Sequence, residues 1–249
     1  MKKIVWMIFL CSTLLGLHAE TLTFATEATY PPFESVDSSG NIIGFDVDIM
    51  NALCVQMQDQ CTIANAPFDS LIPSLQIGKY DAIIASLAIT TQRQQVVDFT
   101  DPYFPASVSF VAPKGSHLKM DAAGLNGKTI GVQGDTTFYH YLKATYGDEI
   151  TINTYKSEES AFTDLANGRV DAVMGDTVII AAWLKQGKNG QQYAYVGQPI
   201  SDVKYFGPGS GIAVSKSNNT LLTKLNKALS VIKKNGQYQQ LMQKWFGVS

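Results

Sequence analysis

The sequence predicts an α/β protein with two lobes. Short apolar strands alternate with helical patterns along the chain, which is typical of sheets whose strands are joined by crossover helices. The alternation runs through two successive halves, and one segment of the first half has a counterpart in the second. The 249 residues are enough for one large domain or two small ones with real cores.

The first half is expected to contain five alternating elements: strand 22–25, helix 45–57, strand 62–64, helix 70–77 and strand 81–85. The helix that follows Gly44 is apolar on most of its turns, so it is expected to be largely buried. Gly78 closes the second helix, as glycine commonly does. A further helix is expected to begin near Thr90.

The second half repeats this scheme with six expected elements: strand 129–132, helix 137–144, strand 151–155, helix 158–166, strand 171–174 and helix 178–185. From Asn219 the tail is expected to be helical throughout, because leucines and other apolar residues recur at helical spacing. Each half therefore has the elements of its own α/β lobe.

Charge excludes one broad class of function. The chain has 19 Lys+Arg against 21 Asp+Glu, which gives a formal net charge of -2. A nucleic-acid binder needs a basic surplus to neutralise phosphates. No nucleic-acid partner is therefore expected.

Residues 1–19 are interpreted as a cleaved secretory signal. Lys2 and Lys3 precede an apolar run that is short for a membrane span and ends at Ala19. Two alternatives stay open: an uncleaved N-terminal anchor, and lipid attachment at Cys11, which the large residue before it disfavours. The rest of the chain is expected to be exported.

Apart from Cys11 the chain has two cysteines, Cys54 and Cys61. An even count in an exported chain predicts one disulfide, here from the end of a helix to the start of a strand. His117 and His140 have no Cys or His at ligand spacing, so both are expected at the surface. No metal and no cofactor are expected.

The internal similarity aligns residues 75–86 with residues 165–176. In both segments a helix ends at Gly, an Asp-Ala pair starts a buried strand, and a polar residue stands at the carboxyl end of that strand. These polar residues are Ser86 and Asp176. Ligands of open α/β sheets bind beyond such ends, so the two are expected to face one another across a cleft. The alternative, that both only cap strand ends, stays open.

Three features near these strand ends suit a zwitterion. Arg93 follows the first strand, and Arg is the side chain best shaped for a bidentate grip on a carboxylate. The turn at residues 135–137 supplies backbone N–H groups at a helix N-terminus, where an anion is favoured. Asp176 is an acceptor suited to an ammonium group. Together they predict a site for an α-amino acid.

Five blocks of sequence carry a family resemblance: TYPPFE at 29–34, GFDVD at 44–48, FDSLIPSL at 68–75, DFTDPY at 98–103 and GRVDA at 168–172. The chain resembles the periplasmic polar amino-acid binding proteins of ABC importers (bacterial solute-binding protein family 3), and among them the arginine-binding and lysine/arginine/ornithine-binding proteins. The resemblance implies a type II periplasmic-binding-protein-like fold. Each lobe is then a mixed sheet flanked by helices, and the ligand cleft lies between the lobes. The spacing of Cys54 and Cys61 also matches the disulfide of that family.

The resemblance also implies residue roles. In the family, the Arg at the position of Arg93 binds the ligand carboxylate with help from the positions of Ser86 and Thr137. The Asp at the position of Asp176 binds the α-ammonium. These roles agree with those expected from the chemistry of the residues themselves.

A second set of positions implies a pocket for a cationic side chain. Aromatic residues at the positions of Tyr30 and Phe68 sandwich the ligand side chain in the family, and flat rings suit a guanidinium or a methylene stem. Glu27 matches a position that is often acidic where the ligand is a cation. The alternatives are core packing for the two rings and a solvated loop position for Glu27.

Two departures from the family pattern lie close to this site. Ala88 stands where some relatives have Ser, which leaves only its backbone N–H for the ligand. Asp135 stands where many relatives have Gly. Its carboxylate is expected to point away from the ligand and to cap the helix that follows.

The expected protein is a monomeric periplasmic receptor that binds L-arginine, or a related basic amino acid, and delivers it to the permease subunits of an ABC transporter. Lobe 1 is expected to comprise residues 20–107 and 207–249, and lobe 2 residues 108–206, with crossings within 104–113 and 203–211. Residues that bind the two ends of the zwitterion then belong to different lobes. Only the closed form satisfies both ends, so ligand binding favours closure.

Two other functions stay open. Cyclohexadienyl dehydratases resemble these binding proteins, and Glu27 is a spare carboxyl that could serve as the general acid of such an enzyme. The loaded lobes could also dock on a sensor protein and act as a signalling input. A serine hydrolase is not expected, because no G-x-S-x-G motif occurs and His140 has no evident partner.

Overall fold

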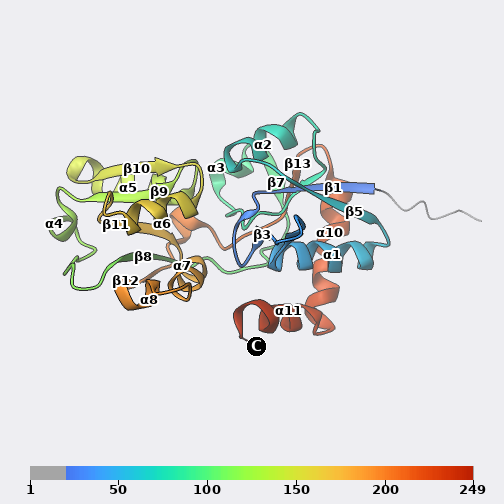
Figure 1. Cartoon of the computed structure of the whole chain (residues 1–249). Coiled ribbons are helices and arrows are strands. Elements are labelled where there is room, and N and C mark those ends of the chain that lie inside the picture. The colour runs from blue at the N-terminus through green and yellow to red at the C-terminus, as the bar shows by residue number, and fades with distance from the viewer. Residues whose placement is uncertain (1–20, 249) are drawn as a thin grey trace, which may run out of the picture.

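The structure is a computed structural model that describes residues 21–248, and it consists of two lobes, each built on a five-stranded sheet (Figure 1). Helices flank both sheets, so the predicted two-lobed α/β fold is confirmed. The signal segment expected at residues 1–19 and Cys11 lie outside the described residues. Between residues 21 and 248, no helix combines the length and the apolar character that crossing a membrane requires.

The first sheet forms the centre of lobe 1, with the strand order β5-β1-β6-β13-β7. Its strands are β1 (Thr21–Thr26), β5 (Gln60–Asn65), β6 (Ala82–Ile83), β7 (Val97–Phe99) and β13 (Ala213–Ser215). β1 is parallel to β5 and β6, whereas β13 is antiparallel to both of its neighbours. The C-terminal strand β13 thus completes a sheet whose other strands come from the first half of the chain.

The helices of lobe 1 are α1 (Phe45–Met57), α2 (Phe68–Gln76), α3 (Thr91–Gln94), α10 (Asn219–Lys234) and α11 (Gln237–Phe246). α1 is buried over most of its surface, as expected, because it packs against β5 on one side and against α10 and α11 on another. Cys54 in the last turn of α1 forms the predicted disulfide with Cys61 in β5.

The expectation of one helical tail is wrong at residues 235–236. α10 ends at Lys234, and Gly236 has a φ of 85°, a left-handed conformation that ends one helix and starts the next. This turn brings α11 back across α1 (Figure 1). The carboxylate of Asp48 in α1 holds it there, accepting hydrogen bonds from Lys244 and Trp245, both at 2.6 Å.

The second sheet forms the centre of lobe 2, with the strand order β10-β9-β11-β8-β12. Its strands are β8 (Val108–Pro113), β9 (Thr129–Gln133), β10 (Thr151–Tyr155), β11 (Ala172–Asp176) and β12 (Tyr193–Ile200). The helices are α4 (Ala122–Leu125), α5 (Thr137–Tyr146), α6 (Glu158–Ala166), α7 (Thr177–Leu184), α8 (Asn189–Gln192) and α9 (Val203–Phe206), with a 3-10 turn η1 (Gly147–Glu149). The three parallel strands β9, β10 and β11 match the predicted strands of this half.

The chain passes between the sheets twice, from β7 to β8 and from β12 to β13. The two passing segments pair with each other: the Ser210 N–H donates to the Phe104 carbonyl at 2.8 Å, and the Tyr103 N–H donates to the Ser210 carbonyl at 2.9 Å. Gly209 has a φ of 141°, and a Cβ at this position would collide with the Phe104 carbonyl. Glycine is therefore needed at position 209 for the close approach of the two segments.

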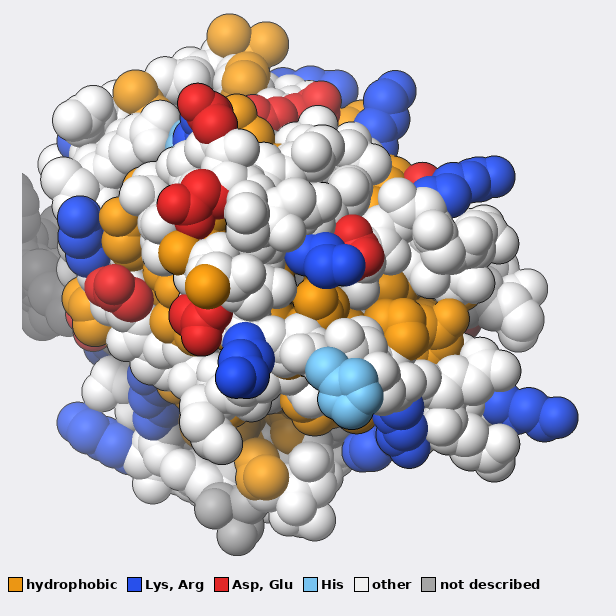
Figure 2. Space-filling view, turned by 90° about the vertical axis from the view of Figure 1, so that its left-hand side faces the viewer, with side chains coloured by type: hydrophobic (Ala, Val, Ile, Leu, Met, Phe, Trp, Pro, Cys, Tyr) orange, Lys and Arg blue, Asp and Glu red, His pale blue; other side chains and the backbone are white. Residues whose placement is uncertain are grey.

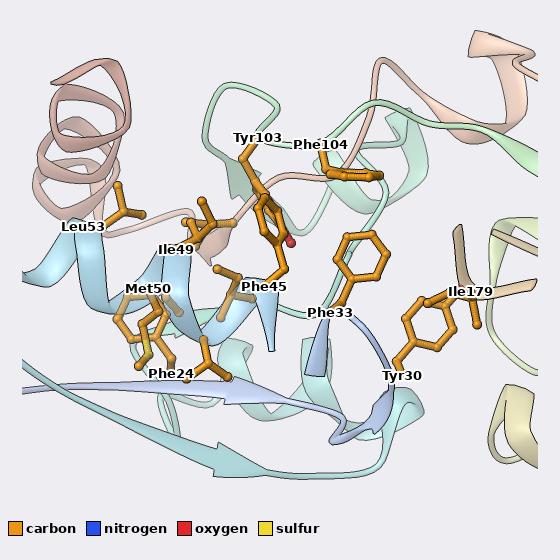
Figure 3. Packing of buried hydrophobic residues seen from close by; sticks show 14 of the residues in the cluster. Phe24, Tyr30, Phe33, Phe45, Ile49, Met50, Leu53, Tyr103, Phe104 and Ile179 are labelled. Atoms are coloured by element: carbon orange, nitrogen blue, oxygen red, sulfur yellow. The ribbon is translucent and has the colours of Figure 1, made fainter. Parts of the chain in front are cut away.

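A small three-stranded sheet, β2 (Thr29–Tyr30), β3 (Glu34–Val36) and β4 (Ile42–Ile43), lies in lobe 1 beside the passing segments. It holds an aromatic cluster in which the Phe33 and Phe104 rings lie 4.8 Å apart and the Phe45 and Phe104 rings 5.7 Å apart. Figure 3 shows this cluster, with Tyr30 at its edge directed toward Ile179 of α7. The buried core thus continues from lobe 1 into lobe 2 at Tyr30.

The face of lobe 2 seen in Figure 2 carries acidic and basic side chains interspersed, without a broad area of one sign. This arrangement agrees with the near-neutral composition of the chain. His117 and His140 are both exposed, as predicted.

Candidate functional site

A cavity lies between the two lobes and is lined by residues of both. Its wall contains all eight residues predicted as ligand contacts: Glu27, Tyr30, Phe68, Ser86, Ala88, Arg93, Thr137 and Asp176. Ser86 follows β6 of the first sheet and Asp176 ends β11 of the second, so the internal repeat did identify two polar residues that line one cleft from opposite lobes. The wall also contains residues that the sequence did not single out, chiefly Glu34, Gln133, Thr136 and Ser210.

Arg93 supplies the positive charge of the site. It lies in α3, and its backbone N–H donates to the side chain of Thr90 at the N-cap, where the helix was expected to begin. Its Nη1 donates to the Ala88 carbonyl at 3.0 Å and its Nη2 to the Asp135 carbonyl at 3.2 Å. Burial lowers the pKa of Arg93 to about 10, and the charge of Asp135 opposes that shift. Arg93 therefore stays cationic at neutral pH and keeps further N–H groups for a carboxylate.

Ser86 lies in a strained turn directly after β6. Its φ is 43°, which is rare for a residue with a side chain. Its N–H donates to Asp46 at 2.7 Å, and its hydroxyl lies 3.1 Å from that of Ser210. The turn also explains why β6 ends at Ile83, two residues earlier than predicted.

The N-terminus of α5 forms the facing wall from lobe 2. Thr137 is the first residue of this ten-residue helix and is buried. The helix cap was predicted wrongly: Thr136 occupies the N-cap position, and Asp135 is an exposed residue in the turn before it, with a φ of 57°. No side chain caps α5, so the backbone N–H groups of its first turn are available to an anion beside Arg93.

Asp176 supplies a negative charge from lobe 2. It occupies the N-cap position of α7 but makes no side-chain capping bond there. Instead its Oδ2 accepts a hydrogen bond from the Tyr30 hydroxyl of lobe 1 at 2.8 Å. Burial raises the pKa of Asp176 to about 6, and the bond from Tyr30 opposes that shift. At pH 7 the carboxylate is thus mainly ionised in a poorly solvated place, which suits an ammonium partner.

Glu27 supplies a second negative charge from lobe 1, and it is buried (6% exposed) and not on a solvated loop. Its Oε1 accepts from the Thr29 hydroxyl at 2.9 Å, and its Oε2 accepts from Gln133 Nε2 of lobe 2 at 2.7 Å. Burial raises the pKa of Glu27, and these two hydrogen bonds oppose the shift. A buried carboxylate held in this way gains from a cation placed against it.

The two predicted rings line the cavity in different settings. Tyr30 is buried, and its ring centre lies 6.1 Å from that of Phe33 in a stacked arrangement, so Tyr30 extends the aromatic cluster to the cavity. Phe68 is partly exposed at the start of α2, and the Arg93 guanidinium lies 5.6 Å from its ring centre. Ala88 is half-buried, and its carbonyl is engaged by Arg93.

Three buried carboxyl groups near the cavity were missed by the sequence analysis. Glu34 and Asp46 are each at most 1% exposed, and burial raises the pKa of both, that of Asp46 to about 7. Glu158 is buried beneath Tyr30 and Asp176, and burial raises its pKa well above the usual value. Nothing in the local sequence distinguishes these three residues from surface acids. Apolar periodicity predicts helices and strands, but it does not show which segments elsewhere in the chain pack over a given side chain.

Replacement of Glu34 by Gln is expected to change how stability depends on pH. Because the Glu34 pKa is raised in the folded state, this carboxyl group keeps its proton in the folded protein above pH 4.5, where it loses it in the unfolded chain. The contribution of Glu34 to the free energy of unfolding therefore falls as pH rises. Gln cannot ionise. The unfolding free energy of Glu34→Gln relative to the native protein should therefore increase between pH 5 and pH 8, by about 1.4 kcal/mol per unit of the removed shift.

Denaturant unfolding of ligand-free protein at both pH values measures this difference. Glu149→Gln, at an exposed position, is the matched control for the chemical change from Glu to Gln. A difference for Glu34→Gln that is the same at both pH values would show that Glu34 is ionised throughout.

Comparison with known proteins gives one family. The family model of bacterial extracellular solute-binding proteins, family 3, matches residues 22–248. The ABC transporter arginine-binding protein 1 of Escherichia coli K12 is 44% identical over 247 residues, which cover 99% of this chain and 99% of that protein.

Solved structures agree with this match. A Salmonella typhimurium periplasmic binding protein described for its high arginine specificity superposes with a TM-score of 0.85 and 43% identity, covering 92% of this chain and 100% of the other. An ancestral amino-acid-binding protein described as a precursor of cyclohexadienyl dehydratase superposes with a TM-score of 0.79 and 30% identity, covering 91% of this chain and 95% of the other.

Proposed function

Because this chain belongs to family 3 of the bacterial extracellular solute-binding proteins, we propose that it is a periplasmic receptor that closes around L-arginine or a related basic amino acid and delivers it to the permease subunits of an ABC transporter. The observation that carries the proposal is that Arg93 and Asp176 line one cavity from opposite lobes. They are complementary to the carboxylate and the ammonium of one zwitterion.

Closure follows from this division of the site. Ser86 and Arg93 in lobe 1 would hold the ligand carboxylate, together with Thr137 at the N-terminus of α5 in lobe 2. Asp176 in lobe 2 would hold the ammonium, with Tyr30 and Phe68 of lobe 1 against the ligand's side chain. A ligand that contacts both lobes stabilises the closed state by its differential contacts.

The proposed lobe boundaries are residues 107/108 and 206/207. They are supported by the change of sheet between β7 and β8 and between β12 and β13. They are also supported by the packing of Phe206 in the core of lobe 2. Lobe 2 is then one continuous insertion into lobe 1.

The preference for a basic side chain rests on Glu27. Its buried carboxylate repels acidic ligands and attracts a guanidinium or ammonium group. The test is calorimetric titration of ligand-free protein with the twenty amino acids, ornithine, citrulline and prephenate. Arginine or another basic amino acid is expected to bind most tightly, and stronger binding of glutamine or glutamate would contradict the proposal.

Replacement of Glu27 by Gln is expected to reduce affinity for arginine by about 10-fold to 100-fold, since it removes a charged partner worth about 1.5 to 3 kcal/mol. Citrulline has nearly the same shape as arginine without the charge, so its affinity should change little. Exposed Glu149→Gln serves as the control. Equal losses for arginine and citrulline would show that Glu27 does not read the ligand's charge.

The dehydratase alternative requires a different use of Glu27. A general acid would need its proton aimed at a leaving hydroxyl, whereas both oxygens of Glu27 accept hydrogen bonds from Thr29 and Gln133. Simple binding explains Arg93 and Asp176, so we propose a receptor without catalytic activity. Turnover of prephenate in the same titration would favour the enzyme.

We further propose that the protein is a monomer, which light scattering tests. The proposed partner of the closed form is a permease or a sensor protein.

A further inference from the structure

Glu158 is a buried acid that takes no part in the wall of the ligand cavity. It is the first residue of α6 in lobe 2, is 1% exposed, and lies behind Tyr30 and Asp176. Its carboxyl group fits against β11 because residue 175 is glycine, and a Cβ there would collide with Oε1 of Glu158. The place of this carboxyl group is therefore built into the packing of lobe 2.

The surroundings of Glu158 do not compensate a negative charge. Among residues 21–248, neither of its oxygens accepts a hydrogen bond. The charged groups that act on it are two other acids, Asp176 and Glu27. A groove between the lobes, which Glu158 lines together with Phe162 and Trp183, has no Lys, Arg or His among the described residues of its wall. Burial and the neighbouring acids therefore raise the pKa of Glu158 well above its usual value.

The neighbour of Glu158 that can share a proton with it is the Tyr30 hydroxyl of lobe 1. A hydroxyl has one hydrogen, and that of Tyr30 is donated to Asp176 Oδ2 at 2.8 Å. Toward Glu158 the hydroxyl can then only accept a hydrogen bond. A protonated carboxyl group supplies the donor for that bond, whereas a carboxylate has none.

We propose that Glu158 is a positioning residue: it is protonated and donates a hydrogen bond to the Tyr30 hydroxyl, which keeps the hydrogen of that hydroxyl directed at Asp176. Both carboxyl groups belong to lobe 2 and the hydroxyl belongs to lobe 1, so this chain of two hydrogen bonds exists only when the lobes meet. It stabilises the closed form from outside the ligand cavity. The inference rests on the proposed function and deepens it, because closure is the step that it assists.

Infrared spectroscopy of the protein in saturating arginine tests the proton directly. At pH 7 the carbonyl band of protonated carboxyl groups should be weaker in Glu158→Gln than in the native protein, because Gln keeps the shape of the side chain and is not an acid. Glu159→Gln, at the exposed next position of α6, is the matched control and should leave the band unchanged. A band of equal strength in Glu158→Gln would show that Glu158 is ionised, which overturns the inference.

Arginine affinity, measured by calorimetry, tests the hydrogen bond. Glu158→Gln keeps an N–H donor for the Tyr30 hydroxyl and should bind arginine within about 2-fold of the native protein. Glu158→Met has a side chain of similar length without a donor, so its affinity should fall by about 3-fold to 10-fold, the effect of one neutral hydrogen bond. A loss in Glu158→Gln as large as that in Glu158→Met would contradict the role of a donor.

The same substitution in the Tyr30→Phe background separates positioning from packing. Without the hydroxyl, the effect of Glu158→Met on arginine affinity should shrink to less than about 2-fold. An equal loss in both backgrounds would give Glu158 a packing role only and overturn the inference, while the proposed function stays intact. The infrared comparison needs only Glu158→Gln, so it decides the matter if Glu158→Met does not fold. If the native protein binds no basic amino acid at all, the proposed function itself fails, whatever the infrared result.

Discussion

Asp176→Ala is expected to remove nearly all binding of amino acids. The substitution leaves the ligand's ammonium buried against Tyr30 without a charged partner, and breaking a buried pair in this way costs about 3 to 5 kcal/mol. Affinity should therefore fall by at least about 100-fold. Calorimetric titration with arginine measures the loss, and Asp148→Ala, in an exposed ion pair with Lys143 in lobe 2, is the control.

A ligand without the ammonium sharpens this test. 5-Guanidinopentanoate is arginine without its α-amino group, so it cannot use Asp176. The native protein should prefer arginine to this compound strongly, and Asp176→Ala should bind both with similar weak affinity. If the substitution weakens both ligands by the same factor, Asp176 acts through the structure of the cleft and not through the ammonium.

Arg93→Met is expected to have the second large effect. It removes the cationic fork that faces the carboxylate while keeping an apolar side chain of similar length against Phe68. The expected loss is about 100-fold in arginine affinity. Arg93→Lys keeps the charge but loses the bidentate geometry, so its loss should be nearer 10-fold.

Argininamide provides the complementary ligand, because it has no carboxylate. The native protein should bind it much more weakly than arginine, whereas Arg93→Met should barely distinguish the two. A large residual preference of Arg93→Met for arginine would assign the carboxylate to the α5 N-terminus instead. Because the pKa of Arg93 is about 10, these results should not change between pH 6 and pH 8 on its account.

Much of the fold could be predicted because it depends on local periodicity. The strands and helices of both halves follow from alternating apolar patterns, and the repeat around Ser86 and Asp176 identified two strand ends that line one cavity. The tail was predicted wrongly because the break at Gly236 lies inside a periodic apolar pattern, and only packing on α1 requires it.

The site was predicted less completely for a similar reason. Residues with distinctive chemistry, such as Arg93, could be named from the sequence. Gln133 and Glu34 could not, because their importance comes from contacts that the local sequence does not show. Gln133 meets Glu27 only across the cleft, and Glu34 is buried beside Asp46. Asp135 was assigned as a cap from residue preference alone, whereas Thr136 occupies that position.

The position of β13 between β6 and β7 has a consequence for biosynthesis. All strands of the second sheet have been synthesised once residue 200 has emerged, whereas the first sheet still lacks β13 at residues 213–215. β7, at the edge of the first sheet, has no neighbour until residues 213–215 follow, and α1 stays uncovered until α10 and α11 are made. The lobe that begins the chain is therefore the last to be completed, and until then β7 presents an unpaired strand edge of the kind that pairs with other chains.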